Sequence, residues 1–342
     1  EICACLVGSE MCIRDSMKIL VTGGAGFIGN CFIRHMLNHH PDYKIVNLDA
    51  LTYAGNLENL YDVKDNPNYE FIYGDICDKH LVMQVVSGVD AIVNFAAESH
   101  VDRSISGPEV FIETNIKGTS ILLQAAKAFH IERYLQVSTD EVYGTLGEDG
   151  YFYETTPLAP NSPYSASKAS ADLIVRSYYE TFGLPTLITR CSNNYGPYQY
   201  PEKLIPLFIS KLLKGEKVPV YGDGMNVRDW IYVYDHCSAI DTVLHKGTPG
   251  QIYNVGGHNE KTNLEITHLI LDALNKDESY IEHVEDRLGH DKRYAICNDK
   301  ITGELGWKPT VSFEEGILLT IDWYLNNQQW IKSVEQRKGR LA

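Results

Sequence analysis

Short apolar segments recur along the chain about every 25 to 45 residues from Met17 onward, a spacing typical of β-α-β units. Between several of these segments, apolar residues recur at three- and four-residue steps, which predicts long helices over residues 108–129 and 163–182. Parallel strands joined by crossover helices form a doubly wound sheet, so we expect an α/β fold. The predicted strands are KILVT, YKIVNL, YEFIYG, AIVNFA, RYLQVS and PTLITR.

The alternation breaks after Arg190, where turn-rich segments such as NNYGPYQYPEK and YGDGMNVRDW follow. We expect a smaller second domain here, interleaved with the first, because the segment QIYNVGG has the character of one more strand returning to the sheet. The predicted domains are 17–192 with 232–256, and 193–231 with 257–335. Residues 1–16 lack the features of a signal peptide, and Met17 opens the first strand, so we expect 1–16 to be a non-native or disordered extension.

Composition excludes several classes of partner. The 342 residues carry a formal net charge of -15, which argues against nucleic acid or an anionic membrane surface. No apolar run approaches the length of a membrane span. The eight cysteines include no C-x-x-C pair, and we expect reduced thiols in a cytoplasmic protein. Cys3, Cys5 and Cys12 lack a neighbouring fourth ligand, so no metal site is predicted.

The segment VTGGAGFIG follows the first predicted strand and opens a helix. Its residues Gly23, Gly26 and Gly29 allow a tight turn and let a pyrophosphate approach the helix N-terminus. Asp49 ends the next strand, where a carboxylate accepts the ribose hydroxyls and repels a 2′-phosphate. The larger domain is therefore predicted to be a Rossmann-type domain that binds NAD rather than NADP.

Two further strand ends are predicted to face the cofactor. Asp75 and Ile76 follow the third strand, a position that often faces the adenine, although Asp75 also suits a helix cap. Ala96 and Ala97 follow the fourth strand, and their small side chains let the cofactor lie close.

Tyr164 and Lys168 lie four residues apart in PYSASKASAD, so a helix places them on one face. An ammonium beside the tyrosine stabilises its phenolate, and the phenolate can then take a proton from a sugar hydroxyl. Together with the preceding glycine motif, this pair resembles the extended form of the short-chain dehydrogenase/reductase superfamily. In that superfamily a Ser or Thr ends the strand before this helix, and here that residue is Thr139.

Asp140 and Glu141 follow Thr139 directly, at the end of a buried strand where two charges are costly. A dehydrogenase or epimerase has no use for them, so we expect an additional proton-transfer step that needs one acid and one base. Their mutual interaction separates their pKa values, so one group can act as the acid and the other as the base.

The arrangement STDEVYG resembles that of the dTDP-glucose 4,6-dehydratase family, over essentially Met17 to the last helix. Other matching segments include LDALTYAGN, FAAESHVDRS, RCSNNYGPYQYPEKLIPLFI, PVYGDGMNVRDWIYV and DRLGHDKRYAI. The resemblance implies that Tyr164, aided by Thr139 and Lys168, removes the proton of the carbon 4 hydroxyl while NAD takes the hydride. It further implies that Glu141 removes the carbon 5 proton and that Asp140 protonates the hydroxyl leaving carbon 6.

The same resemblance implies binding residues in both predicted domains, with the smaller one holding the substrate, dTDP-glucose. Arg228 and Arg287 are expected to hold the diphosphate, since arginine is its best planar partner. Further cofactor contacts are implied for Phe27, Ile28, Leu51, Thr52, Phe95, Ser99, Thr114 and Asn194. Further substrate contacts are implied for Ser99, Asn193, Lys203, Leu204, Pro219, Tyr221, Asn263, Asp286 and His290.

Two positions depart from the family pattern. Leu288 stands where the family usually has proline, and this change is expected to loosen the loop that carries Arg287. Ala50 stands where the family often has lysine, at the adenosine edge of the cofactor site. The alternatives are a UDP-glucose 4,6-dehydratase, another sugar-nucleotide epimerase or decarboxylase of this fold, or a catalytically silent NAD-binding sensor. The helices over 108–129 and 163–182 have more apolar residues than packing on one sheet face requires, which predicts a homodimer.

Overall fold

The computed structural model describes residues 16–286 and 290–341, with side chains described up to residue 337. Its centre is a seven-stranded sheet in the order β10-β6-β5-β4-β1-β2-β3, and every neighbouring pair is parallel. The strands are β1 (Lys18–Thr22), β2 (Lys44–Asp49), β3 (Tyr69–Tyr73), β4 (Ala91–Asn94), β5 (Arg133–Thr139), β6 (Thr186–Cys191) and β10 (Ile252–Val255). The predicted doubly wound fold is confirmed, and β10 is the returning strand predicted in QIYNVGG.

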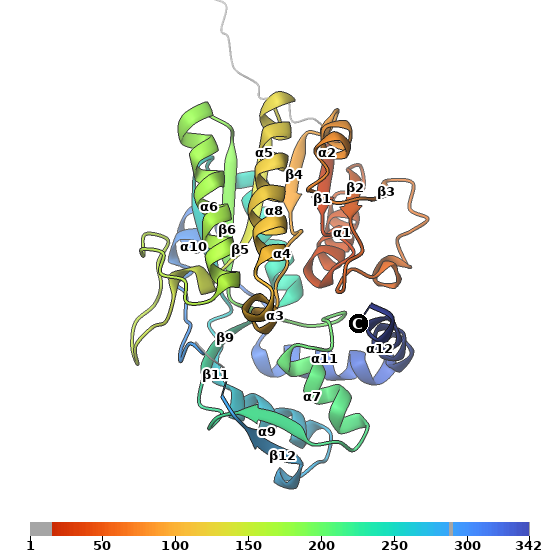
Figure 1. The fold of residues 1–342 in the computed structure, drawn as a ribbon, viewed down its shortest axis with the longest axis vertical. Coiled ribbons are helices and arrows are strands. Elements are labelled where there is room, and N and C mark those ends of the chain that lie inside the picture. Colours follow the sequence, from red (N-terminus) through yellow and green to blue (C-terminus); the bar gives the residue numbers. More distant parts are fainter. Residues whose placement is uncertain (1–15, 287–289, 342) are drawn as a thin grey trace, which may run out of the picture.

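Helices cover both faces of this sheet (Figure 1). Side chains alternate along β1, so Ile19 and Val21 join one apolar core while Leu20 joins the other. The first core contains α1 (Phe27–His39), α8 (Val233–Lys246) and part of α10 (Asp299–Leu305). The second contains α2 (Lys79–Val86), α5 (Thr119–Ala128) and α6 (Pro163–Phe182).

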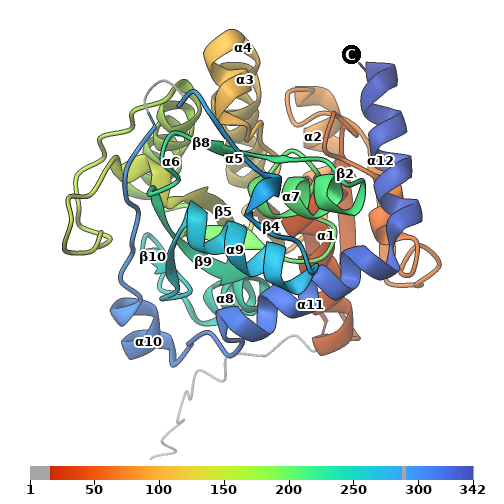
Figure 2. The same ribbon diagram turned by 90° about the horizontal axis from the view of Figure 1, so that it is seen from below.

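A second group of elements lies beyond the carboxyl ends of the strands (Figures 1 and 2). Two small sheets join β7 with β9 and β11, and β8 with β12. Its elements are β7 (Asn193–Tyr195), α7 (Leu204–Leu213), β8 (Val218–Tyr221), β9 (Val227–Tyr232), β11 (Glu260–Thr262), α9 (Asn263–Ala273), η4 (Glu278–Tyr280), β12 (Ile281–Val284) and α11 (Phe313–Asn326). They share an apolar core with the first part of α12 (Gln328–Leu341).

The segment predicted as one helix over 108–129 contains a change of helix type. After α3 (Val101–Ser106), α4 (Glu109–Phe111) leads into a π-helical stretch, η2 (Ile112–Gly118), which continues as α5. Such π turns are frequent at functional sites, and this one carries the buried Asn115. The helix predicted over 163–182 is confirmed as α6.

Several predictions lie outside what the structure tests. Residues 1–15, Arg287 and Leu288 are outside the described residues, and the domain boundaries stay a prediction. Within the described part, no helix combines the length and apolarity that a membrane crossing requires.

Candidate active site

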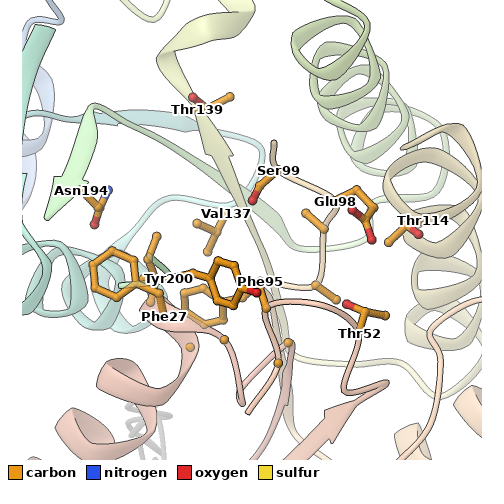
Figure 3. Close-up of a pocket in the computed structure, with 18 of the residues that line it drawn as sticks. Phe27, Thr52, Phe95, Glu98, Ser99, Thr114, Val137, Thr139, Asn194 and Tyr200 are labelled. Atoms are coloured by element: carbon orange, nitrogen blue, oxygen red, sulfur yellow. The ribbon is translucent and has the colours of Figure 1, made fainter. Parts of the chain in front are cut away.

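A cleft of about 310 Å³ opens at the carboxyl ends of the strands, where the strand order reverses between β1 and β4. A second hollow of about 200 Å³ adjoins it, lined by the second group of elements. The residues that line both are Glu141, Asn193, Asn194, Gln199, Glu202 and Lys203. One continuous cleft therefore runs from the glycine loop to the small sheets, and the close-up in Figure 3 shows part of its wall.

The glycine loop after β1 fits only residues without a side chain. A Cβ on Gly23, whose φ is +70°, would lie 2.7 Å from the backbone nitrogen of Ala96. A Cβ on Gly29 would lie 2.4 Å from the carbonyl oxygen of Gly23. The backbone can therefore turn tightly into α1, whose first N–H groups face the cleft side and attract an anionic group. This cradle fits a pyrophosphate, as predicted.

Asp49 ties this loop to the next strand. Its carboxylate accepts hydrogen bonds from the backbone nitrogens of Ala25 at 2.8 Å and Leu51 at 2.7 Å. Burial raises the pKa of Asp49, and these two hydrogen bonds counteract that effect. The carboxylate lines the cleft, and its remaining lone pairs suit the ribose hydroxyls of NAD. The residues present therefore fit the cofactor predicted from the sequence.

The C-terminal helix holds the loop after Asp49 in place. Arg337 of α12 donates to the carbonyl oxygen of Leu51 at 2.9 Å and to that of Gly55. Leu51 has a φ of +50°, a left-handed conformation that costs energy unless its surroundings hold it. Trp330 also donates to Asn59, 2.8 Å away, so two side chains of α12 hold this segment in place. Figure 2 shows where α12 lies in the fold. Sequence analysis assigned no role to Arg337.

Replacing Arg337 with methionine is expected to weaken NAD binding about tenfold, because hydrogen bonds from a charged donor contribute about 1.5–3 kcal/mol. The loss should appear in the NAD dissociation constant measured by calorimetry, while the KM for the sugar nucleotide stays unchanged at saturating NAD. Lys332→Met removes one charge from the exposed side of the same helix and serves as the control. Equal NAD affinity in both variants would contradict the positioning role.

Tyr164 and Lys168 lie on one face of α6, as predicted. Ser162 caps this helix through a reciprocal capping box, and Pro163 occupies its first turn. The Lys168 ammonium donates to the carbonyl oxygen of Val137 on β5 at 2.7 Å, and burial lowers the pKa of the lysine. Burial and then the charge of Glu141 raise the pKa of Tyr164 well above its usual value, so in this state the tyrosine keeps its proton.

The π turn η2 supports this helix from the side. The Asn115 side chain donates to the hydroxyl of Ser167 at 2.8 Å and to the carbonyl oxygen of Glu98 at 3.0 Å. It also accepts from the backbone nitrogen of Glu98 at 2.9 Å. Asn115 therefore joins the segment after β4, which lines the cleft, to the helix that carries Tyr164 and Lys168.

Thr139, Asp140 and Glu141 lie where β5 ends and a single 3-10 turn, η3 (Asp140–Tyr143), begins. Thr139 caps this turn by accepting from the Glu141 nitrogen at 3.3 Å, and its hydroxyl donates to Asp140 at 3.3 Å. A hydrogen bond also links the side chains of Thr139 and Tyr164. The three predicted residues and the helix pair therefore meet at one point of the cleft.

The two carboxyl groups have different surroundings. Asp140 is 1% exposed, and within the described part of the chain its Oδ2 has no hydrogen-bond partner. Burial, then the charge of Glu141, then that of the buried Asp229 raise the pKa of Asp140 well above its usual value. Glu141 is partly exposed and lines both hollows. Asp140 is therefore suited to donate a proton, and Glu141 is placed to accept one from a bound molecule.

The second hollow carries the predicted substrate residues. Arg228 donates to the carbonyl oxygens of Val227 at 2.7 Å and Asp291 at 2.8 Å, and its guanidinium packs 4.4 Å from the ring centre of Tyr294. This packing fixes the guanidinium at the wall of the hollow. The His290 imidazole lies 2.6 Å from the Asp286 carboxylate, which orients it.

The structure brings most of the predicted residues together. Leu51 and Asp286 are not among the described residues that line the cleft. Leu51 donates its backbone N–H to Asp49, and Asp286 lies beside His290, and both Asp49 and His290 line it. The predicted cofactor residues that line the cleft are Gly23, Gly26, Phe27, Ile28, Gly29, Asp49, Thr52, Asp75, Ile76, Phe95, Ala96, Ala97, Ser99, Thr114, Tyr164, Lys168 and Asn194. The predicted substrate residues that line the two hollows are Ser99, Thr139, Asn193, Lys203, Leu204, Pro219, Tyr221, Arg228, Asn263 and His290.

Sequence analysis missed other wall residues. His100 was assigned no role, yet it lines the second hollow and pairs with Glu202 at 3.9 Å. Its position three residues after the small pair Ala96–Ala97 at a strand end was a usable signal. Tyr294 also lines the second hollow, and no local signal in the sequence indicated it, because it comes near Glu141 only through folding.

Comparisons with known proteins agree with this geometry. Residues 20–320 match the model of the family described as GDP-mannose 4,6 dehydratase. A dTDP-glucose 4,6-dehydratase of Xanthomonas campestris is 54% identical over 94% of this chain and 97% of its own. The structure of DesIV, a dTDP-glucose 4,6-dehydratase of Streptomyces venezuelae with NAD bound, has a TM-score of 0.91 and 52% identity, covering 93% of this chain and all of that one. A UDP-glucose 4-epimerase of Thermus thermophilus in complex with NAD has a TM-score of 0.84 and 31% identity over 91% of this chain and all of that one.

Proposed function

This chain belongs to the dTDP-glucose 4,6-dehydratase family, and we propose that the residues gathered in its cleft carry out that family's reaction. The reaction converts dTDP-glucose into dTDP-4-keto-6-deoxyglucose by oxidation at carbon 4, loss of water across carbons 5 and 6, and reduction at carbon 6. The enzyme is thus an NAD-dependent hydro-lyase without net redox change.

The chemistry that bound NAD supplies is acceptance of a hydride from carbon 4 and its return to carbon 6. Tyr164 accepts the proton of the carbon 4 hydroxyl, and Thr139, which hydrogen-bonds to the Tyr164 side chain, aids this transfer. Lys168, held by the carbonyl oxygen of Val137, supplies the positive charge that favours the phenolate. Burial raises the pKa of Tyr164 in this state, so the tyrosine depends on that charge and on the charge of the oxidised nicotinamide.

Elimination uses the two adjacent carboxyl groups. The ketone at carbon 4 acidifies the neighbouring C–H, and Glu141 takes this carbon 5 proton. Asp140 gives its proton to the carbon 6 hydroxyl, which leaves as water. Glu141 then returns a proton to carbon 5 after carbon 6 has been reduced. The observation that supports this assignment most directly is that buried Asp140, whose pKa is raised well above its usual value, adjoins partly exposed Glu141.

The alternatives account for fewer residues. An epimerase or decarboxylase of this fold needs Tyr164 and Lys168 but no acid–base pair after Thr139. A silent NAD-binding sensor needs only the glycine loop and Asp49. A UDP-glucose 4,6-dehydratase uses the same residues, and the preference for thymine over uracil rests on the likeness to dTDP-glucose enzymes.

The proposal is tested by incubating the purified protein with dTDP-glucose in deuterated water, without added NAD. The mass and deuterium content of the product are then measured by mass spectrometry. The expected product has lost one water and carries one deuterium at carbon 5, and turnover without added NAD indicates that the cofactor is retained. No product from dTDP-glucose or UDP-glucose, even with NAD added, would overturn the dehydratase function in favour of a silent binder or another sugar nucleotide.

A homodimer and a cytoplasmic location stay predictions. The helices predicted to form the interface carry exposed apolar side chains, among them Val110, Ile112 and Leu173, which supports a contact face there. Sedimentation at micromolar concentration is expected to give the mass of two chains, about twice 38.5 kDa. A monomer under these conditions would contradict the prediction.

A further inference from the structure

Four imidazole and carboxylate groups converge far from the cleft, where the end of α1 packs against α8. The Asp241 carboxylate lies 2.8 Å from the Nε2 of His35, 3.0 Å from the Nε2 of His40 and 2.8 Å from the Nδ1 of His245. Nothing in the proposed reaction uses these residues. The cluster lies about 18 Å along α1 from Phe27 at the glycine loop, on the opposite edge of the sheet.

Three of these groups are spaced as metal ligands. One donor atom each from His40, Asp241 and His245 lies within 4.8 Å of the other two. Tetrahedral ligands about 2.0–2.2 Å from Zn²⁺ lie roughly 3.3–3.6 Å apart. The two distances from Asp241 to the imidazole nitrogens, 3.0 and 2.8 Å, are slightly shorter than this, and the two imidazole nitrogens lie within 4.8 Å of each other. All three are partly exposed, between 16% and 26% for the side chains, so an ion can enter and the groups can adjust.

Groups around the three ligands already orient them. The Nε2 of His245 lies 3.0 Å from the hydroxyl of Tyr43, which leaves its Nδ1 turned to Asp241. His35 holds the Oδ2 of Asp241 at 2.8 Å. His40 lies 3.0 Å from the other carboxylate oxygen, Oδ1, so the carboxylate has imidazole partners on both oxygens. Metal-binding histidines and carboxylates characteristically have such partners on their outer atoms.

We propose that His40, Asp241 and His245 bind one divalent transition-metal ion, with Zn²⁺ as the expected ion and water at the fourth position. Two imidazoles and a carboxylate with an open position form a donor set that suits zinc better than calcium or magnesium, which prefer oxygen alone. Because His40 follows α1 and the other two ligands are on α8, the ion joins two helices that cover the same face of the sheet. The ion is expected to raise the stability of the folded protein and to leave the turnover of the active site unchanged.

The first test titrates Co²⁺, a spectroscopic substitute for Zn²⁺, into chelator-treated full-length protein without an affinity tag. Cys3, Cys5 and Cys12 are replaced by serine so that thiols outside the described residues do not compete. We expect one Co²⁺ per chain, with the visible absorption of a four-coordinate nitrogen and oxygen site. At a hundredfold excess over its Kd, Zn²⁺ should raise the melting temperature by about 3–5 °C.

Variants identify the ligands. Asp241→Asn and His40→Gln should each weaken Co²⁺ binding more than tenfold, and Tyr43→Phe should weaken it about tenfold by freeing His245. His268→Gln changes a histidine on α9, outside the cluster, and should leave binding unchanged. Turnover of dTDP-glucose should not depend on the metal. Absence of a stoichiometric Co²⁺ site in the parent protein, or equal binding by Asp241→Asn and His268→Gln, would overturn the proposal.

Discussion

Replacing Glu141 with glutamine is expected to lower the turnover of dTDP-glucose by about 10²–10⁴-fold, the usual contribution of a positioned base. Glutamine keeps the size and the partial exposure of the side chain but cannot accept the carbon 5 proton. In deuterated water the product should form at this lower rate and still carry one deuterium at carbon 5, because every product molecule has lost its original carbon 5 proton. Product formation and isotope incorporation are measured together by mass spectrometry.

The matched control is Glu148→Gln, which removes a carboxylate from an exposed position seven residues further along the chain. It should keep the full rate and the full deuterium content. NAD retained by purified Glu141→Gln should equal that of the parent, because the substitution leaves the glycine loop and Asp49 intact. Product formation by Glu141→Gln at the parental rate would assign the base to another residue.

Replacing Asp140 with asparagine is expected to lower turnover by about 10²-fold or more, because the carbon 6 hydroxyl then leaves without a proton donor. Glu141 remains, so the substrate should still exchange its carbon 5 proton for deuterium while water loss is slow. In the parent, burial and Glu141 hold the pKa of Asp140 high, and the rate should fall as the pH rises through that pKa. The variant should lack this decline.

Asp140→Asn should also raise the stability of the folded enzyme near neutral pH. In the unfolded chain Asp140 ionises near pH 4, while the folded state keeps the proton because its pKa is raised. The unfolded state therefore gains from ionisation as the pH rises, and the parent loses stability up to the folded-state pKa. Asparagine cannot ionise, so the melting temperature of the variant relative to the parent should rise as the pH increases from about 4 to the folded-state pKa of Asp140. An unchanged difference would show that Asp140 is ionised in the fold.

The glycine loop and the catalytic groups were predictable because their chemistry is local. Gly23 and Gly29 follow a strand and open a helix, and the close approach of the backbone tolerates no side chain there. Tyr164 and Lys168 share a helix face because they are four residues apart. Thr139 to Glu141 are contiguous at a strand end, so their meeting with the helix pair follows once the parallel sheet is inferred.

The residues of the helical segment over 108–129 were predicted, but its π-helical stretch was not. Apolar periodicity does not distinguish a regular α-helix from one with a π turn, because the widened turn shifts the register by only one residue. The shift places Asn115 between Glu98 and Ser167, and those partners are distant in the sequence. Asn115 was therefore absent from the predicted site.

By itself, the sequence predicted the α/β order of the elements and the glycine loop that the structure shows. It also supplied the candidates for the acid, the base and the helix pair, whose roles stay predictions. Only the tertiary structure decided which partners surround them. Arg337 reaches Leu51 across 286 residues, and Asp241 meets His40 across 201. The raised pKa of Asp140 depends on burial and on Asp229, which comes near only in the folded chain. Such contacts follow from the packing of helices and sheets, and desolvation is a property of the folded surroundings, so no local pattern in the sequence records them.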